Sequence, residues 1–239
     1  MAQALGIRLL DRNGADLPFG GGALSELSRI DMKGIDPRVS ESEFSVACDV
    51  NNPLTGPEGA AAVYGPQKGA TSAVVGRLDE ALAHFAKVVR RDIGPDINDI
   101  PGSGAAGGLG GGMIAFLGGH LRPGGDIVLE AVNFDQYLNG ANLVITGEGQ
   151  LDFQTVYSKA PIGVAQRAKQ KGIPVIAVVG SLGDRFTDVH EHGINAASSI
   201  VPAPMTLETA SENAFDLIAS ATEQAIRMLH TGSQVFRPT

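Results

Sequence analysis

The 239-residue sequence contains no tryptophan, three tyrosines and a single cysteine, Cys48. Without a second cysteine the chain cannot form an intramolecular disulfide, which suits the reducing conditions of the cytoplasm. Charged residues make up only 18% of the chain, the net charge is −8, and no basic cluster is interleaved with aromatic residues. Nucleic acid is therefore not an expected partner. No apolar run approaches the roughly 18 residues that a membrane-spanning helix needs, so no membrane partner is expected either.

Glycine and proline are abundant, with 32 and 13 residues, while 43% of the chain is hydrophobic. This content excludes collagen and disorder and allows one large core or two small ones. Eleven glycines fall among the 24 residues from 102 to 125. We place a domain boundary there, between residues 1–125 and residues 126–239.

The second domain has the pattern of a β-α-β unit. Short apolar runs at residues 143–145 and 174–179 flank a helical pattern at residues 160–171. A second crossover through residues 187–192 leads to a strand at residues 197–201, and a long amphipathic helix is predicted from Leu207 to Met228. Apolar strands separated by helices predict an α/β fold with a doubly wound parallel sheet. Three strands are few for such a sheet, so further strands are expected to complete it.

The first domain reads differently. Strands are predicted at residues 6–10 and 44–50 and a long helix at residues 71–91. Residues 1–5 are similar to the last turns of a helix that Gly6 closes. Two interpretations stay open: a start codon that happens to open a helix, or a chain that has lost its beginning.

The segment from Thr146 to Thr155 is the strongest functional signal. It follows a predicted buried strand, at the edge where open α/β sheets bind ligands. Glu148 and Asp152 lie four residues apart on a glycine-flexed loop and could bind Mg²⁺ or activate a hydroxyl, while Lys159 could offset phosphate charge. In the alternative, the two carboxylates only cap the following helix and Lys159 is solvated.

Residues 102–107, Gly-Ser-Gly-Ala-Ala-Gly, match the letters of the dinucleotide fingerprint, but no strand is predicted before them. An anion site at a helix N-terminus and close packing by small residues both explain these glycines. No Gly-Lys dipeptide occurs, which excludes a Walker A loop. A third segment, residues 48–54, leads to residues 65–70; its Asp and Asn side chains could bind a polyol or a carboxylate, or could form Asx turns only.

Four blocks together resemble the bacterial glycerate kinases, which phosphorylate D-glycerate with ATP. The blocks are residues 48–54 (CDVNNPL), 64–70 (YGPQKGA), 104–110 (GAAGGLG) and 146–155 (TGEGQLDFQT). The resemblance implies a Rossmann-like domain interrupted by an inserted second α/β domain, with the active site in the cleft between them. Residues 1–125 would be the later part of the inserted glycine-rich domain, and residues 126–239 the C-terminal half of the Rossmann-like domain. Roughly the first third of a typical member would have no counterpart here.

The resemblance also implies roles for particular residues, with ATP as co-substrate and Mg²⁺ bound by Glu148 and Asp152. Many members have Arg where Gln150 stands and Gly where Ser158 stands. The implied catalytic residues are Asp49, Glu148, Asp152 and Lys159, and the implied substrate- or nucleotide-binding residues are Asn52, Gln67, Lys68, Gly102, Ser103, Gly104, Gly107, Gly147, Gly149, Gln154 and Thr155.

Three functional interpretations follow: an active glycerate kinase, a truncated and inactive kinase fragment, or a nucleotide-binding oxidoreductase. The missing strand before residue 102 argues against the third. Sheet edges left open by truncation would favour a homodimer. For the 239-residue chain alone we expect little or no glycerate-dependent turnover of ATP.

Overall fold

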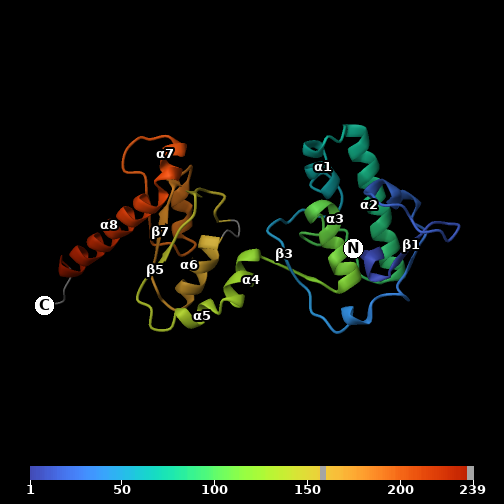
Figure 1. The fold of residues 1–239 in the computed structure, drawn as a ribbon, viewed down its shortest axis with the longest axis horizontal. Coiled ribbons are helices and arrows are strands. Elements are labelled where there is room, and N and C mark those ends of the chain that lie inside the picture. The colour runs from blue at the N-terminus through green and yellow to red at the C-terminus, as the bar shows by residue number, and fades with distance from the viewer. Residues whose placement is uncertain (157–159, 236–239) are drawn as a thin grey trace. The chain divides into compact units, whose positions relative to one another are not determined.

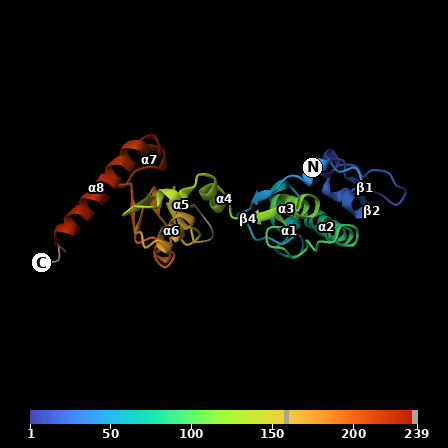
Figure 2. The ribbon, with the colours of Figure 1, turned by 90° about the horizontal axis from the view of Figure 1, so that it is seen from below.

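The computed structural model describes residues 1–156 and 160–235. The chain divides into two compact units, Met1–Ile127 and Val128–Thr239, each with its own hydrophobic core (Figures 1 and 2). Both units mix helices with short strands, so the molecule is of the α/β type. None of the described helices combines the length and the apolar character that crossing a membrane requires.

The first unit is built around one long helix, α2 (Ser72–Asp92). The helix confirms the one predicted at residues 71–91, and the side chain of Thr71 caps it by accepting a hydrogen bond from the Val74 amide. Its buried face includes Phe85, which meets Phe116 of α3 with 6.0 Å between ring centroids. The other elements of this unit are η1 (Ala2–Leu5), β1 (Arg8–Leu10), η2 (Gly21–Glu26), β2 (Arg29–Asp31), η3 (Pro37–Val39), β3 (Ser45–Ala47), α1 (Ala60–Tyr64), η4 (Pro66–Lys68), α3 (Ala105–Leu117) and β4 (His120–Arg122), where η marks a 3₁₀ helix.

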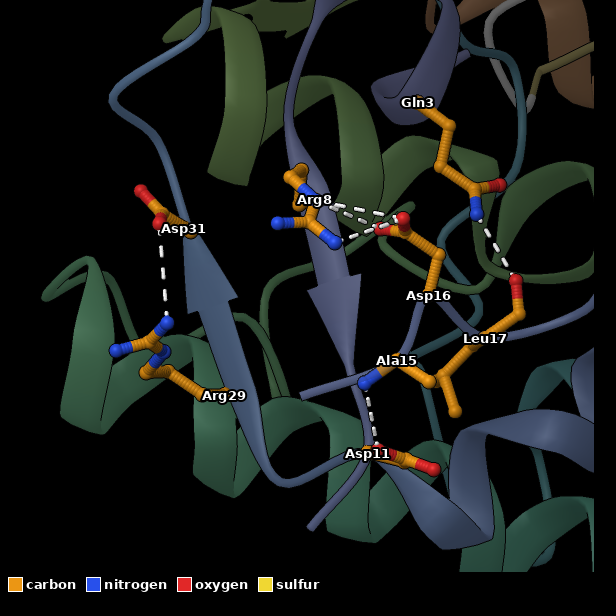
Figure 3. Close-up of polar contacts among 8 residues, drawn as sticks. All are labelled: Gln3, Arg8, Asp11, Ala15, Asp16, Leu17, Arg29 and Asp31. Atoms are coloured by element: carbon orange, nitrogen blue, oxygen red, sulfur yellow. Dashed lines mark hydrogen bonds and ion pairs between the residues drawn. The ribbon is translucent and has the colours of Figure 1, made fainter. Parts of the chain in front are cut away.

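Strands β1 and β2 pair antiparallel, and polar contacts fix the loop between them (Figure 3). The Arg8 guanidinium contacts the Asp16 carboxylate at 2.9 Å, and Asp11 accepts a hydrogen bond from the Ala15 amide. Gln3 of η1 donates to the Leu17 carbonyl at 3.0 Å. The Gln3 contact holds the N-terminal turn against the loop; this turn is a 3₁₀ helix that ends at Gly6, as the sequence suggests.

Strands β3 and β4 pair in parallel, with Ser45 opposite His120, Val46 opposite Leu121 and Ala47 opposite Arg122. The crossover between them carries α1, α2 and α3. Residues 44–50 are predicted as one strand, but only Ser45–Ala47 is extended in the sheet. The chain leaves the sheet after Ala47, so Asp49 and Asn52 lie beyond the end of β3.

The second unit contains a three-stranded parallel sheet in the order β5-β7-β9, as the β-α-β pattern predicts. All five residues of the central strand β7 are buried. Val175, Ala177 and Val179 share a core with α6, whereas Ile176 and Val178 contact Leu217 of α8 on the other face. The elements are α4 (Gly124–Ala131), which crosses the boundary between the units, α5 (Phe134–Tyr137), β5 (Val144–Thr146), β6 (Gln150–Leu151), α6 (Ala160–Gln170), β7 (Val175–Val179), β8 (Ser181–Leu182), η5 (Phe186–His190), β9 (Ala196–Ser199), α7 (Leu207–Glu212) and α8 (Ala214–Val235).

The long helix predicted from Leu207 to Met228 is wrong in one respect, because the structure has two helices, α7 and α8. Asn213 breaks the pattern: its side-chain amide donates to the Thr209 carbonyl at 2.8 Å, which ends α7. Leu207 and Met228 are 82% and 66% exposed, so the apolar periodicity overstates burial at both ends of this segment.

Candidate active site

The candidate active-site loop, residues 147–155, follows β5 at the carboxyl edge of the sheet. It runs beside the end of β7, where the Gly180 amide donates to the Glu148 carbonyl and the Ser181 amide to the Gly149 carbonyl, each at 3.0 Å. The contact is so close that a methyl group at Gly147 would overlap the Val178 carbonyl oxygen. The backbone of this loop is therefore fixed by main-chain contacts on the side of the sheet.

The carboxylates of Glu148 and Asp152 are held by a small hydrogen-bond network centred on Thr155. The Thr155 hydroxyl donates to Oε1 of Glu148 at 2.7 Å and accepts from the Asp152 amide at 3.1 Å. Oδ1 of Asp152 accepts from the Gln154 amide at 2.8 Å, which is an Asx turn. Thr155 is completely buried, whereas Glu148 and Asp152 are partly exposed. The network presents two oriented carboxylates at the loop surface.

A cavity of about 1210 Å³ lies at the carboxyl ends of the three parallel strands. Its wall includes the last or following residue of each strand, Thr146, Gly180 and Ser199, together with Gly147, Glu148 and Gly149 of the loop. Asp152, Gln154 and Thr155 do not line it. Of the residues predicted in this loop, the structure therefore brings only the first three to the cavity. Lys159, the predicted cation, lies outside the described residues.

Of the residues predicted in the first unit, Asn52 and the glycine-rich loop meet at the N-terminal end of α3. The Gly104 amide donates to the Asn52 carbonyl at 3.0 Å, so the segment after β3 packs directly on the glycine-rich loop. Asp49 is exposed, and its Oδ1 accepts from the Gly124 amide at 2.8 Å. Gln67 and Lys68 belong to η4, which follows α1, and both side chains are exposed.

The side chain of Asn52 is already engaged within the protein. The Tyr64 hydroxyl donates to its Oδ1 at 2.7 Å, and its Nδ2 donates to the Glu58 carbonyl at 2.8 Å. Tyr64 belongs to the block of residues 64–70, but the sequence predicts no role for it. It lies twelve residues from Asn52, a separation that matches no helical or strand period. Ser181 and Ser199 of the cavity wall are also missed, although each lies beside the carboxyl end of a strand.

The glycine-rich loop has an unusual backbone. Ala106, Gly107 and Gly108 have positive φ values of 50°, 76° and 97° inside the span of α3. A non-glycine residue in this region is strained by roughly 1–2 kcal/mol, and such strain is typical of ligand sites. Ser103 is fully buried, and among the described residues its hydroxyl oxygen has no hydrogen-bond partner. Gly102 and Gly104 are buried beside it, whereas Gly107 is exposed.

Close packing by small residues explains some of these glycines but not all of them. A methyl group at Gly110 would overlap the Gly102 carbonyl oxygen, so Gly110 serves close packing. Gly107 has no atom within 4 Å of an added methyl group and is open to solvent. Residues 93–101, directly before Gly102, form no strand, which confirms that the dinucleotide fingerprint lacks its required context.

Comparison with known proteins identifies the relatives of this chain. A family model described as the glycerate kinase family matches residues 1–230. A glycerate kinase from Halalkalibacterium halodurans is 55% identical, covering 92% of this chain and 58% of that protein. The glycerate 2-kinase of Escherichia coli is 45% identical, covering 97% of this chain and 61% of that protein.

A solved structure agrees with these matches. A crystal structure from Salmonella typhimurium LT2, whose description names glycerate kinase 2, superposes with a TM-score of 0.84 and 45% identity. The match covers 98% of this chain and 61% of that one. The chain thus spans about three fifths of the length of the relatives it matches.

Proposed function

The chain belongs to the glycerate kinase family, and we propose that its function is to transfer the γ-phosphate of ATP to D-glycerate. The family match over residues 1–230 carries this proposal. The cavity at the carboxyl ends of β5, β7 and β9 supports it, because open α/β sheets bind nucleotides and other ligands at that edge. We further propose that the first unit is the later part of an inserted α/β domain and that the second unit is the C-terminal half of a Rossmann-like domain.

The loop carboxylates suit Mg²⁺ that arrives with ATP. Mg²⁺ is usually held by one or two carboxylates together with waters and substrate phosphates. Glu148 lines the cavity, and Asp152, which does not, is linked to it through Thr155. We assign both to Mg²⁺, which when bound would add positive charge beside the phosphate oxygens. Gly149 would leave room for the nucleotide, Gly147 would let the loop pack against β7, and Gln154 would bind at the outer side of the loop.

In the first unit we propose that the glycine-rich loop binds an anionic group. The left-handed turn at Ala106 and the exposed Gly107 support this role, since backbone amides in such turns bind anions. The fully buried Ser103 would hold the loop from inside. Asp49 or Asp152 would orient or deprotonate the attacking glycerate hydroxyl. Lys68 would stabilise charge on the glycerate carboxylate or the phosphoryl group, as would Lys159. Further ligand contacts are assigned to the exposed residues Gln67 and Gly107. The buried Gly102 and Gly104, together with Asn52, would act by holding the backbone of the loop.

The Escherichia coli relative is a glycerate 2-kinase. On that ground we propose the 2-hydroxyl of D-glycerate as the acceptor. Phosphorus NMR of the product distinguishes 2-phosphoglycerate from 3-phosphoglycerate, and L-glycerate serves as the control for stereochemistry. A homodimer stays a prediction, which sedimentation of the chain would test.

The decisive experiment measures ADP release by the full chain with ATP, Mg²⁺ and D-glycerate. If turnover occurs, Glu148→Gln is expected to lower it at least about a hundredfold, because loss of one electrostatic group of this kind costs about that much. Glu191→Gln is the matched control, since Glu191 follows η5 before the amino end of β9 and does not line the cavity. Equal turnover in wild type and Glu148→Gln would remove Glu148 from the mechanism. No turnover, with no binding of ATP or glycerate, would refute the proposed function for this chain.

A further inference from the structure

Thr155 is one of two polar side chains that are completely buried among the residues the structure describes. The resemblance to glycerate kinases implies that Thr155 binds substrate or nucleotide. Its geometry contradicts direct contact, because the hydroxyl has no exposed surface and does not line the cavity beside Glu148. Its single hydrogen is already donated to Oε1 of Glu148 at 2.7 Å. A ligand could therefore receive no hydrogen bond from it.

The direction of both hydrogen bonds is fixed by chemistry. An ionised carboxylate only accepts, so the Thr155 hydroxyl must be the donor to Glu148. A backbone amide only donates, so the hydroxyl oxygen accepts from Asp152 at 3.1 Å. One hydroxyl thus connects the side chain of Glu148 to the backbone of Asp152. These are the two residues assigned above to Mg²⁺.

Glu148 is held at two points as a result. Its carbonyl accepts from the Gly180 amide at 3.0 Å, and its carboxylate accepts from Thr155. With the backbone fixed, rotation of the side chain is the remaining freedom, and the buried hydroxyl removes it. Because Oε1 is bonded to Thr155, Oε2 is the oxygen that we expect to bind a ligand.

We infer that Thr155 is a positioning residue: it sets the orientation of the Glu148 carboxylate and its spacing from Asp152 for the metal of the metal–nucleotide complex. This inference rests on the proposed function. Hydrogen bonds to charged groups contribute about 1.5–3 kcal/mol, which corresponds to roughly a ten- to hundredfold change in affinity. We expect Thr155→Val, which keeps the shape and removes the hydroxyl, to weaken metal binding by about that factor.

The test uses the full chain and four variants: Thr155→Val, Thr155→Ser, Glu148→Gln and the double variant Thr155→Val/Glu148→Gln. Binding of Mn²⁺ is followed by electron paramagnetic resonance, with and without the non-hydrolysable ATP analogue AMP-PNP. Thr155→Ser keeps the hydroxyl and is expected to bind Mn²⁺ within about threefold of wild type. In the Glu148→Gln background, loss of the hydroxyl is expected to have little further effect, because Thr155 acts through Glu148.

Two additional readouts separate positioning from folding and from the proposed function. Hydrogen exchange of the Asp152 amide is expected to accelerate in Thr155→Val, while circular dichroism shows whether the variant folds. If Thr155→Val fails to fold, the Mn²⁺ affinities of Thr155→Ser and Glu148→Gln are compared instead. A tenfold loss of Mn²⁺ affinity in Thr155→Ser would then overturn the inference. Unchanged Mn²⁺ affinity in a folded Thr155→Val, additive effects in the double variant, or absence of Mn²⁺ binding in wild type would also overturn it. Mn²⁺ binding in a chain that shows no turnover and binds neither ATP nor glycerate would refute the proposed function alone.

Discussion

Replacing Gly180 by alanine is expected to break the backbone contact between the candidate active-site loop and the end of β7. A methyl group at Gly180 would overlap the carbonyl oxygen of Gly149 and lie 3.2 Å from its carbonyl carbon, and both are backbone atoms that cannot rotate away. Gly149 offers a matched control on the other side of the same contact, because a methyl group there meets no atom within 4 Å. Neither glycine has a left-handed φ, so only the contact differs between the two variants.

The expected cost follows from the hydrogen bonds that must separate. The Gly180 amide bonds to the Glu148 carbonyl and the Ser181 amide to the Gly149 carbonyl. Each backbone hydrogen bond contributes about 1 kcal/mol net, so Gly180→Ala is expected to lower the free energy of unfolding by about 2 kcal/mol. In a chain of this size that corresponds to a decrease in Tm of about 4–8 °C. Gly149→Ala should be neutral or stabilising by less than about 1 kcal/mol, because alanine restricts the unfolded chain.

The measurement is urea unfolding followed by circular dichroism, together with hydrogen exchange at Ser181. Faster exchange of the Ser181 amide in Gly180→Ala, but not in Gly149→Ala, would locate the damage at the loop contact. A free energy of unfolding within about 0.5 kcal/mol of wild type would refute the reasoning. So would an equal loss in the control.

Three further predictions concern other parts of the chain. Hydrogen bonding from Arg91 lowers the pKa of Asp92 below its ordinary value of 3.8, so Asp92 stabilises the fold above that pH and this contribution is lost as the pH falls through the lower folded pKa. The stability difference between wild type and Asp92→Asn, measured by urea unfolding from pH 7 to pH 2, should therefore be constant near neutrality and shrink in acid; a difference that grows in acid would contradict it. Leu151→Ala, at a fully buried position, should cost about 2–5 kcal/mol by the same method, and a loss below 1 kcal/mol would show that the site collapses around the change. Tyr64→Phe removes the hydrogen bond to Asn52 and should cost about 0.5–1.5 kcal/mol, with faster exchange of the Gly104 amide as its local sign.

Local patterns predict the sheet of the second unit well. The apolar run before Thr146, the helical spacing after residue 160 and the run ending at Val179 form a parallel β-α-β unit in the structure. These elements depend on side-chain periodicity over short distances, which the sequence displays directly. The exposure of Ile145, at 42%, was not predictable, because burial on the edge strand depends on what covers it.

The contacts that shape the candidate site are the part that sequence reasoning could not predict. Thr155 meets Glu148 seven residues away, and Tyr64 meets Asn52 twelve residues away. Such pairs arise from loop conformation and follow no helical or strand period. A list of functional residue types therefore does not tell which residues are free to contact a ligand and which are engaged in holding other residues. Thr155 and Asn52 are the examples here.

Backbone packing explains why glycine marks these segments. At Gly147 and Gly180 an added methyl group would overlap a carbonyl oxygen, so the path of the loop is set by main-chain atoms before any side chain is considered. Gly149 takes part in the same contact through its carbonyl oxygen, yet it also borders the cavity. A methyl group added there would meet no atom within 4 Å. Gly149→Ala therefore probes ligand approach without disturbing the fold. If the nucleotide passes close to this backbone, the variant should bind AMP-PNP about tenfold more weakly by calorimetry, since one blocked contact of this size costs about 1.4 kcal/mol. Unchanged affinity in a variant of unchanged stability would show that the nucleotide contacts another part of the cavity wall.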